Sequence, residues 1–168
     1  VNSINLMILI RNMFFYGKSA MEDKCSKGIV VGRPFGGVGV LWRKSLGNNL
    51  KLYGTDPDNR VIVVGFRNRG DLVLCFGVYF PYDDHSKDYL VKIDKVLGYI
   101  SMIREKYLGC KSVILGDFNF ECQSRCKGFI TFDKFISSSD ILCCDDKDIS
   151  GVGYTYCHET LDQHSLID

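Results

Sequence analysis

Short apolar runs separated by turn residues make up most of this sequence, and this pattern favours a fold built mainly from β-strands. Two neighbouring runs, VIVVGF at 61–66 and LVLCFGVYF at 72–80, are continuously apolar, as expected of strands covered on both faces. Gly70 lies between them and can adopt a positive φ, which predicts a hairpin turn. The remaining strand-like runs are 28–31, 38–42, 49–53, 112–115, 141–144 and 154–157.

Two stretches show helical periodicity instead. In the first, Ser86 is a suitable N-cap, apolar residues recur every three or four positions from Leu90 to Tyr107, and Gly109 can end the helix. The second is weaker and covers about 127–138. A chain of 168 residues with this mixture predicts one α/β domain with stacked sheets.

The net charge of +1 hides an asymmetry along the chain. Residues 1–54 carry eight Lys and Arg against two acidic residues, a net +6, whereas residues 55–168 carry thirteen against eighteen, a net −5. A basic half beside an acidic half suits a polyanion bound next to a metal site. Scattered, solvated charge is the competing interpretation, and the charges alone do not separate the two.

The eight cysteines favour reduced thiols in an intracellular compartment, because a secreted disulfide scaffold is usually shorter and poorer in core residues. A zinc site is the alternative interpretation, although the paired C-x-x-C spacing typical of such sites is missing. Its ligands would come from Cys122, Cys126, Cys143, Cys144, Cys157 and His158. The apolar run INLMILI at 4–10 is too short to span a membrane, so no membrane association is expected.

The stretch VILGDFN at 113–119 ends an apolar run with an aspartate and an asparagine. Side chains alternate along an extended segment, so Asp117 and Asn119 would project from one face while Phe118 turns into the core. Open α/β sheets carry their sites at such strand ends. A carboxylate can orient a water molecule or accept its proton, and an amide can donate to a phosphate oxygen without adding negative charge. A local Asx-turn is the alternative explanation of the same D-x-N pattern.

A second strand end in the chain carries Tyr79. The run VYFPY at 78–82 is stopped by Pro81, so the hydroxyl of Tyr79 can reach the same rim of the sheet as Asp117. A tyrosine buried in the core explains this residue equally well.

Six segments of the chain occur together in a familiar order. They are GRPFGGVGVLWRKSL (32–46), NRVIVVGF (59–66), VYFPY (78–82), VILGDFN (113–119), GYTY (153–156) and SLID (165–168). In this order, over roughly the whole chain, the sequence resembles the endonuclease/exonuclease/phosphatase superfamily, and more narrowly the endonuclease domain of non-LTR (LINE-type) retrotransposons. The resemblance implies two mixed β-sheets packed face to face with flanking helices, a four-layer sandwich that is incomplete here. It also implies a Mg²⁺-dependent phosphodiesterase acting on DNA, with Mn²⁺ as a possible substitute.

The resemblance assigns roles to individual residues. Asp117 matches the catalytic aspartate, which orients or deprotonates the attacking water, and it is a weak candidate metal ligand. Asn119 matches the phosphate-binding asparagine, and Tyr79 matches the tyrosine that reaches the scissile phosphate. Asp168 matches the aspartate that orients the catalytic histidine, and Thr155 is expected to contact the substrate.

The basic N-terminal half adds candidate contacts to the DNA backbone at Arg33, Arg43 and Lys44. Such contacts raise affinity in a salt-dependent way without reading sequence. Taken singly, each is better explained as an ordinary solvated side chain.

The sequence departs from the family pattern at two essential positions. The family has an acidic metal ligand, usually Glu, after an early strand, and neither Glu22 nor Asp23 stands in that context. Its catalytic histidine belongs to an S-D-H motif that would follow Asp168. We therefore expect residues 1–168 to be a single domain that lacks the first strands and the last strand with the S-D-H segment, and that cannot cleave by itself.

In the parent protein, the expected activity is a nick in one strand of DNA. The expected setting is a retrotransposon polyprotein that functions in the nucleus, with a reverse transcriptase domain following in the same polypeptide. Two alternatives remain: another phosphatase of the superfamily acting on lipid or nucleotide phosphates, and a noncatalytic remnant of such a domain.

Overall fold

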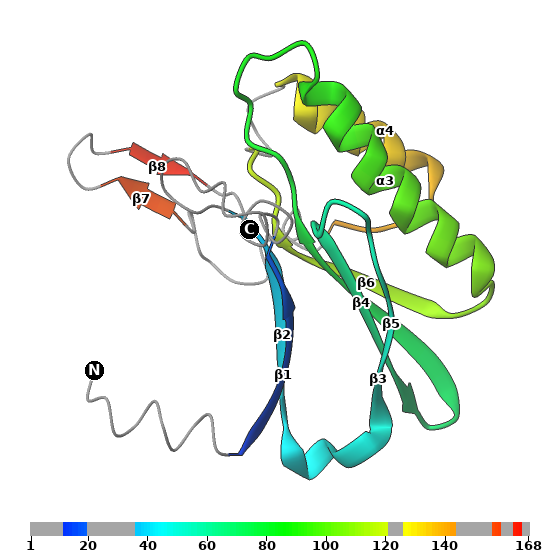
Figure 1. Cartoon of the computed structure of the whole chain (residues 1–168). Coiled ribbons are helices and arrows are strands. Elements are labelled where there is room, and N and C mark those ends of the chain that lie inside the picture. The colour runs from blue at the N-terminus through cyan, green and yellow to red at the C-terminus, as the bar shows by residue number, and fades with distance from the viewer. Residues whose placement is uncertain (1–11, 20–35, 121–125, 144–155, 159–162, 166–168) are drawn as a thin grey trace. The chain divides into compact units, whose positions relative to one another are not determined.

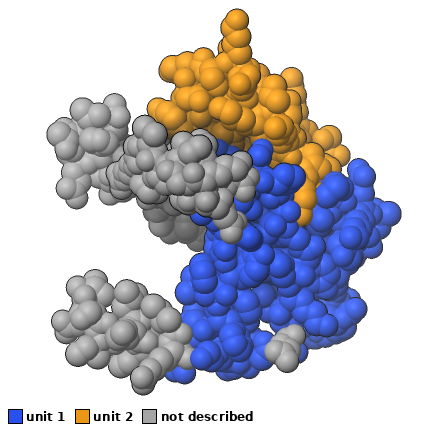
Figure 2. Space-filling view, viewed as in Figure 1, with its two compact units in different colours: residues 1–79, 102–115 blue, residues 80–101, 116–168 orange. Residues whose placement is uncertain are grey.

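The structure, a computed structural model, describes residues 12–19, 36–120, 126–143, 156–158 and 163–165. The chain divides into two compact units, which are coloured separately in Figure 2. Unit 1 comprises residues 1–79 and 102–115, and unit 2 comprises residues 80–101 and 116–168. Each unit contains its own buried apolar side chains.

Unit 1 is built mainly from strands, as the apolar runs predict (Figure 1). β1 (Met13–Lys18) pairs antiparallel with β2 (Val38–Arg43), and a short 3₁₀ helix, η1 (Lys44–Asn49), follows β2. A second sheet has the strand order β3-β4-β5-β6. Its strands are β3 (Leu50–Thr55), β4 (Val61–Asn68), β5 (Asp71–Tyr79) and β6 (Lys111–Asp117), and the last two residues of β6 belong to unit 2.

The hairpin of β4 and β5 forms the centre of this sheet. Residues 61–65 of β4 are buried without interruption, which confirms the prediction of a strand covered on both faces. The turn consists of Arg69 and Gly70, which have φ values of 50° and 97°, and Asn68 pairs with Asp71 across it. Two consecutive residues with positive φ match the right-handed twist of a hairpin, so the predicted turn at Gly70 is confirmed.

The two sheets of unit 1 approach each other closely at Gly77. A Cβ atom at this position would lie 2.9 Å from Ile62 Cγ2, on the neighbouring strand β4, and 3.2 Å from Val38 Cγ1, on β2 of the other sheet. Only a residue without a side chain allows this approach. The predicted face-to-face stacking of two sheets in an α/β fold is therefore confirmed.

The first predicted helix is present as α3 (Tyr89–Lys106), but its predicted start at Ser86 is wrong. The N–H group of Ser86 donates to the Asp84 carboxylate at 3.0 Å, and the first helical i→i+4 bond runs from Lys92 N–H to Asp88 O at 2.9 Å. The Ser86 N–H is thus bonded to a local side chain, and the helix starts three residues later in the sequence, at Tyr89. Gly109, predicted to end this helix, adopts a φ of 82° in the turn that follows it.

The second predicted helix is α4 (Lys127–Ser138), in unit 2, and it covers the predicted range. Its N-cap is Cys126, whose Sγ accepts the Phe129 N–H at 3.4 Å. The strand predicted at 141–144 is wrong for its described residues, 141–143. Asp140 has a φ of 52°, and Ile141 N–H bonds back to Ile136 O at 3.5 Å, so this segment caps α4 instead of entering a sheet.

The core of unit 2 contains a group of phenylalanines besides the buried aliphatic side chains of α3. Phe80 contacts three other phenylalanines with ring centroids between 5.4 and 5.7 Å away, and these rings also contact one another. The three are Phe118, Phe120 and Phe132, and we call the four residues the phenylalanine cluster.

Unit 2 also contains a short antiparallel pair of strands, β7 (Tyr156–His158) and β8 (Gln163–Ser165). The run predicted at 154–157 overlaps β7, and the run at 28–31 lies outside the described residues. Neither α3 nor α4 is long and apolar enough to cross a lipid bilayer.

Candidate functional site

Asp117 and Asn119 form a tight turn at the end of β6. Oδ1 of Asp117 accepts the backbone N–H of Asn119 at 3.0 Å, and Asn119 has a φ of 53°. This geometry is that of an Asx-turn, the alternative explanation of the D-x-N pattern. An Asx-turn fixes the carboxylate relative to the backbone, so it does not by itself separate a structural role from a chemical one.

The extended backbone predicted for residues 113–119 ends before Asn119. β6 stops at Asp117, and the left-handed backbone of Asn119 is not extended. Strand alternation therefore does not place the Asn119 side chain, and that step of the prediction is wrong. Phe118 does turn towards apolar neighbours, since its ring stacks on Phe80 with centroids 5.4 Å apart and planes inclined by 21°.

Both backbone polar groups of Phe80, its N–H and its C=O, form hydrogen bonds with residues of this turn. The Phe80 N–H donates to Asp117 O at 2.8 Å, and the Asn119 side-chain Nδ2 donates to Phe80 O at 2.9 Å. Phe80 is fully buried in the phenylalanine cluster. These bonds tie the chain after β6 to the residue that directly follows Tyr79. They use one of the two amide N–H groups of Asn119.

Tyr79 is the last residue of β5, in unit 1, and it is half-buried. It is not the core tyrosine of the alternative interpretation, because the buried face of β5 carries Leu74, Phe76 and Val78. Its described neighbour is Arg60, whose guanidinium carbon lies 5.4 Å from the centre of its ring.

Two of the three predicted DNA-backbone contacts lie at the end of β2. Arg43 is the last residue of the strand and Lys44 begins η1, and both side chains are exposed. Lys44 Nζ lies 5.7 Å from the centre of the Phe14 ring, and that ring is 5.6 Å from Trp42. The positive charges are therefore accessible, as a contact to phosphate requires, and an ordinary solvated role remains equally compatible with this geometry.

Three predicted site residues lie outside the described residues. They are Arg33, Thr155 and Asp168. Four of the six candidate zinc ligands also lack a described side chain, and the other two, Cys126 and Cys143, are free thiols.

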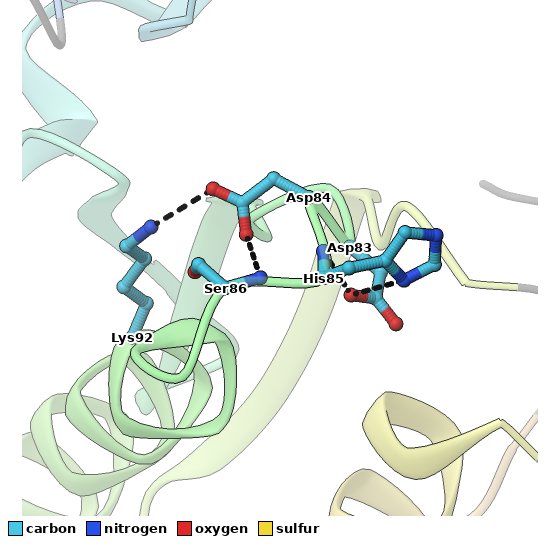
Figure 3. Close-up of polar contacts among 5 residues, drawn as sticks. All are labelled: Asp83, Asp84, His85, Ser86 and Lys92. Carbon is cyan, nitrogen blue, oxygen red and sulfur yellow. Dashed lines mark hydrogen bonds and ion pairs between the residues drawn. The ribbon is translucent and has the colours of Figure 1, made fainter.

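The loop before α3 contains polar contacts for which the sequence analysis predicts no role (Figure 3). Asp84 accepts the Ser86 N–H and lies 3.3 Å from Lys92 Nζ, while Asp83 accepts the His85 N–H at 2.9 Å. Hydrogen bonds from Ser86, with a smaller contribution from Lys92, lower the pKa of Asp84 to about 2. These contacts organise the start of the helix, and the short spacing of D-D-H-S is the signal that could have indicated them.

Two further groups titrate away from their usual range. Burial raises the pKa of Tyr89 to about 12, with smaller contributions from Cys126 and Asp83. Burial also raises the pKa of the Cys75 thiol. Both groups therefore stay protonated at neutral pH, and Cys75 is not an activated nucleophile.

No protein-family model matches the sequence, and the comparison with curated proteins finds no match. Three solved structures are similar in fold. The endonuclease domain of TRAS1, a telomere-specific non-LTR retrotransposon, has a TM-score of 0.49 at 17% identity, covering 76% of this chain and 52% of its own. The 3′ phosphatase NExo from Neisseria, bound to a product DNA hairpin, has a TM-score of 0.62 at 15% identity, covering 97% of this chain and 67% of its own. Humanized TDP2 of D. rerio has a TM-score of 0.50 at 12% identity, covering 98% and 62%.

The similarity to NExo and TDP2 extends over almost the whole chain. It shows that the chain has the endonuclease/exonuclease/phosphatase fold, as the motifs predict, in an incomplete form. The chain spans 52% of the length of the TRAS1 domain and 67% of that of NExo.

Proposed function

We propose that this chain is part of a phosphodiesterase domain that nicks one strand of DNA, with Asp117, Asn119 and Tyr79 at its site. The observation that supports the proposal is the Asx-turn at the end of β6, in which Oδ1 of Asp117 accepts the backbone N–H of Asn119 at 3.0 Å. The fold supports a phosphate-ester substrate, and the DNA hairpin bound to NExo supports DNA as its source.

In the proposed reaction, water attacks phosphorus and the bond from phosphorus to the 3′ oxygen breaks. The 3′ oxygen leaves with the bonding electron pair and takes a proton from solvent, so the products carry a 5′ phosphate and a free 3′ hydroxyl. Asp117 orients the water and accepts its proton, while the second amide N–H of Asn119 donates to a phosphate oxygen. The Tyr79 hydroxyl donates to another phosphate oxygen. Asp168 orients the histidine of the complete domain, and Thr155 contacts the substrate.

Affinity for DNA comes in this proposal from the basic N-terminal half. Arg33, Arg43 and Lys44 contact the phosphate backbone, which makes binding depend on salt and leaves sequence unread. The setting that the motifs favour is a retrotransposon protein that acts in the nucleus. There the 3′ hydroxyl primes a reverse transcriptase domain of the same polypeptide.

Mg²⁺, with Mn²⁺ as a substitute, is the proposed cofactor, but the described residues do not fit it as a complete ligand set. Within the described ranges no group of three or more His, Cys, Asp or Glu side chains can hold a metal ion. Mg²⁺ demands near-octahedral oxygen coordination, and Asp117 is a single carboxylate with one oxygen bonded to Asn119.

The test is nicking of supercoiled plasmid by the longest natural form of the protein, with and without EDTA. Asp117→Asn keeps the size of the side chain and removes the proton acceptor, so nicking should fall at least about 100-fold. Asp133→Asn, on the exposed face of α4, removes one carboxylate elsewhere and should leave the rate unchanged. EDTA should abolish nicking, and residues 1–168 alone should not nick, because they match neither the acidic metal ligand nor the histidine. Full activity of Asp117→Asn would reject the role of this residue.

A phosphatase is the second candidate, and its support is the TM-score of 0.62 between this chain and the 3′ phosphatase NExo. Release of inorganic phosphate from lipid or nucleotide monoesters, without nicking of plasmid, would favour it. If the folded protein shows neither nicking nor phosphate release, the noncatalytic remnant is favoured.

A further inference from the structure

The ring of Tyr79 lies on the less buried face of β5. Burial alternates along this strand, so Leu74, Phe76 and Val78 are buried while Tyr79 is half-buried. The next residue but one is Pro81, which cannot donate to a ladder of hydrogen bonds. A tyrosine at such a strand end needs another contact to fix its ring.

Arg60 supplies that contact in three ways, all within unit 1. The Tyr79 N–H donates to Arg60 O at 2.8 Å, and Arg60 Nη1 donates back to Tyr79 O at 3.3 Å. The guanidinium carbon also lies 5.4 Å from the centre of the Tyr79 ring. A guanidinium within about 6 Å of an aromatic ring is attracted to its face. Arg60 therefore contacts both the backbone and the ring of Tyr79.

Arg60 is itself fixed by the connection between β3 and β4. Oδ1 of Asp56 accepts the backbone N–H groups of Arg60 and Val61, each at 2.6 Å, and its Oδ2 accepts the Asp58 N–H at 3.2 Å. Asp56 is only 6% exposed and is the one buried charged residue in the described part of the chain. A buried carboxylate that accepts several N–H groups makes a rigid loop. The position of the Arg60 backbone is thus set before its side chain reaches Tyr79.

Arg67, near the other end of β4, allows the effect of the ring contact to be separated from that of the charge. Its Nη1 also donates to a backbone carbonyl, that of Gly70 at 2.9 Å, and its side chain is exposed. No described aromatic ring lies against its guanidinium. Arg67 is therefore a matched control for the loss of one positive charge and one hydrogen bond to a carbonyl.

We propose that Arg60 is the positioning residue of Tyr79 and holds the phenol ring so that its hydroxyl meets a phosphate oxygen of the DNA strand. This inference rests on the proposed function, since it assumes that Tyr79 contacts the phosphate. A hydroxyl donates well only when it lies about 2.6–3.2 Å from its acceptor. A ring without Arg60 against its face adopts more orientations, and fewer of them place the hydroxyl at that distance.

The test is a double-mutant cycle on nicking by the longest natural form of the protein, with variants R60M, Y79F, R60M/Y79F, R60K and the control R67M. R60M should lower kcat about tenfold with little change in KM, because a misplaced group costs rate more than binding. In the Y79F background, which lacks the hydroxyl, R60M should cost nothing further. R60K, which keeps the positive charge and an N–H donor, should recover part of the loss, and R67M should match the unaltered protein. Thermal unfolding of each variant separates loss of fold from loss of rate.

The same cycle on the affinity for a labelled DNA duplex in EDTA, with residues 1–168, gives a readout that needs no cleavage. Coupling between R60M and Y79F in Kd would support the pair as a phosphate-binding unit. A protein that shows this coupling but does not nick DNA would reject only the proposed reaction. An equal loss of kcat from R60M with and without the Tyr79 hydroxyl would overturn the inference, and so would an equal, measurable weakening of Kd in both backgrounds. So would the absence of any effect of R60M on either quantity.

Discussion

Asn119 combines a backbone role and a side-chain role in one residue. Its φ of 53° lies in the left-handed region, where asparagine and glycine are favoured, and its Nδ2 donates to Phe80 O at 2.9 Å. The proposed contact with phosphate uses the second N–H of the same amide. Substitutions can separate these roles, because glycine keeps the backbone freedom and loses the amide.

Three substitutions at Asn119 should therefore differ in rank. Asn119→Gly should leave the turn formed, and Asn119→Ala should destabilise the fold by a further 1–2 kcal/mol or so, because its Cβ disfavours a positive φ. Asn119→Asp should reduce nicking more than Asn119→Gly does, since it places negative charge against the phosphate. Urea unfolding and nicking rates measure the two effects.

Asn59 provides the control for this comparison. It also has a φ of 53°, and its Nδ2 donates to a backbone carbonyl, that of Ser19 at 3.1 Å. Asn59→Gly should change stability about as much as Asn119→Gly, and it should lower nicking less than Asn119→Gly does. Near-normal turnover of Asn119→Asp would contradict the placement of the amide against phosphate.

At the level of elements, the loop before α3 is ordered by the Asp84 carboxylate, which accepts the Ser86 N–H, and the helix begins at Tyr89. The Asp84 pKa is lowered from 3.8 to about 2, first by the side-chain and backbone hydrogen bonds of Ser86 and less by Lys92. A depressed carboxyl pKa contributes stability that is present above pH 3.8 and is lost as the pH falls towards 2.

NMR titration of the Asp84 side-chain carboxyl should give a midpoint near pH 2. Ser86→Ala should raise this midpoint more than Lys92→Met does, because the hydrogen bonds of Ser86 are the larger cause of the shift. A larger effect of Lys92→Met would mean that charge, and not hydrogen bonding, organises the loop.

The contact between the two sheets of unit 1 makes Gly77 sensitive to any side chain. Gly77→Ala places a Cβ 2.9 Å from Ile62 Cγ2 and 3.2 Å from Val38 Cγ1, so it should destabilise the fold by about 1–3 kcal/mol. Gly98→Ala is the matched control, because nothing lies within 4 Å of its Cβ position in α3. It should stabilise the helix by about 0.5–1 kcal/mol. Urea unfolding measures both, and equal effects of the two would show that the sheets can separate at Gly77.

For the molecule as a whole, the hydrophobic pattern of the sequence correctly predicts those strands and helices whose formation depends on burying apolar side chains. The runs at 61–66 and 72–80 are strands because their side chains are buried, and α4 follows its apolar spacing. The start of α3 and the segment 141–143 were predicted wrongly because local hydrogen bonds, from Ser86 N–H to Asp84 and from Ile141 N–H to Ile136 O, outweigh the apolar pattern.

The candidate site shows the same division. Asp117, Asn119 and Tyr79 can be chosen from the sequence because each lies in a short motif at a strand end. The Asx-turn is local and can be read from the D-x-N spacing, but the bond from Asn119 to Phe80 joins residues 39 apart, and the contact of Arg60 with Tyr79 joins residues 19 apart. Such tertiary contacts leave no spacing that a single sequence can reveal.

The register of the β4–β5 hairpin links its turn to its open end. Val61 faces Val78, so Arg60 and Tyr79 adjoin the last pair of the ladder, while Arg69 and Gly70 close the other end. With about 3.4 Å per residue, the two ends are roughly 25 Å apart. Adding or removing one residue at the turn would shift every partner along the ribbon and put another side chain opposite Arg60. The length of a solvent-exposed turn thus governs, from a distance, which ring the arginine meets.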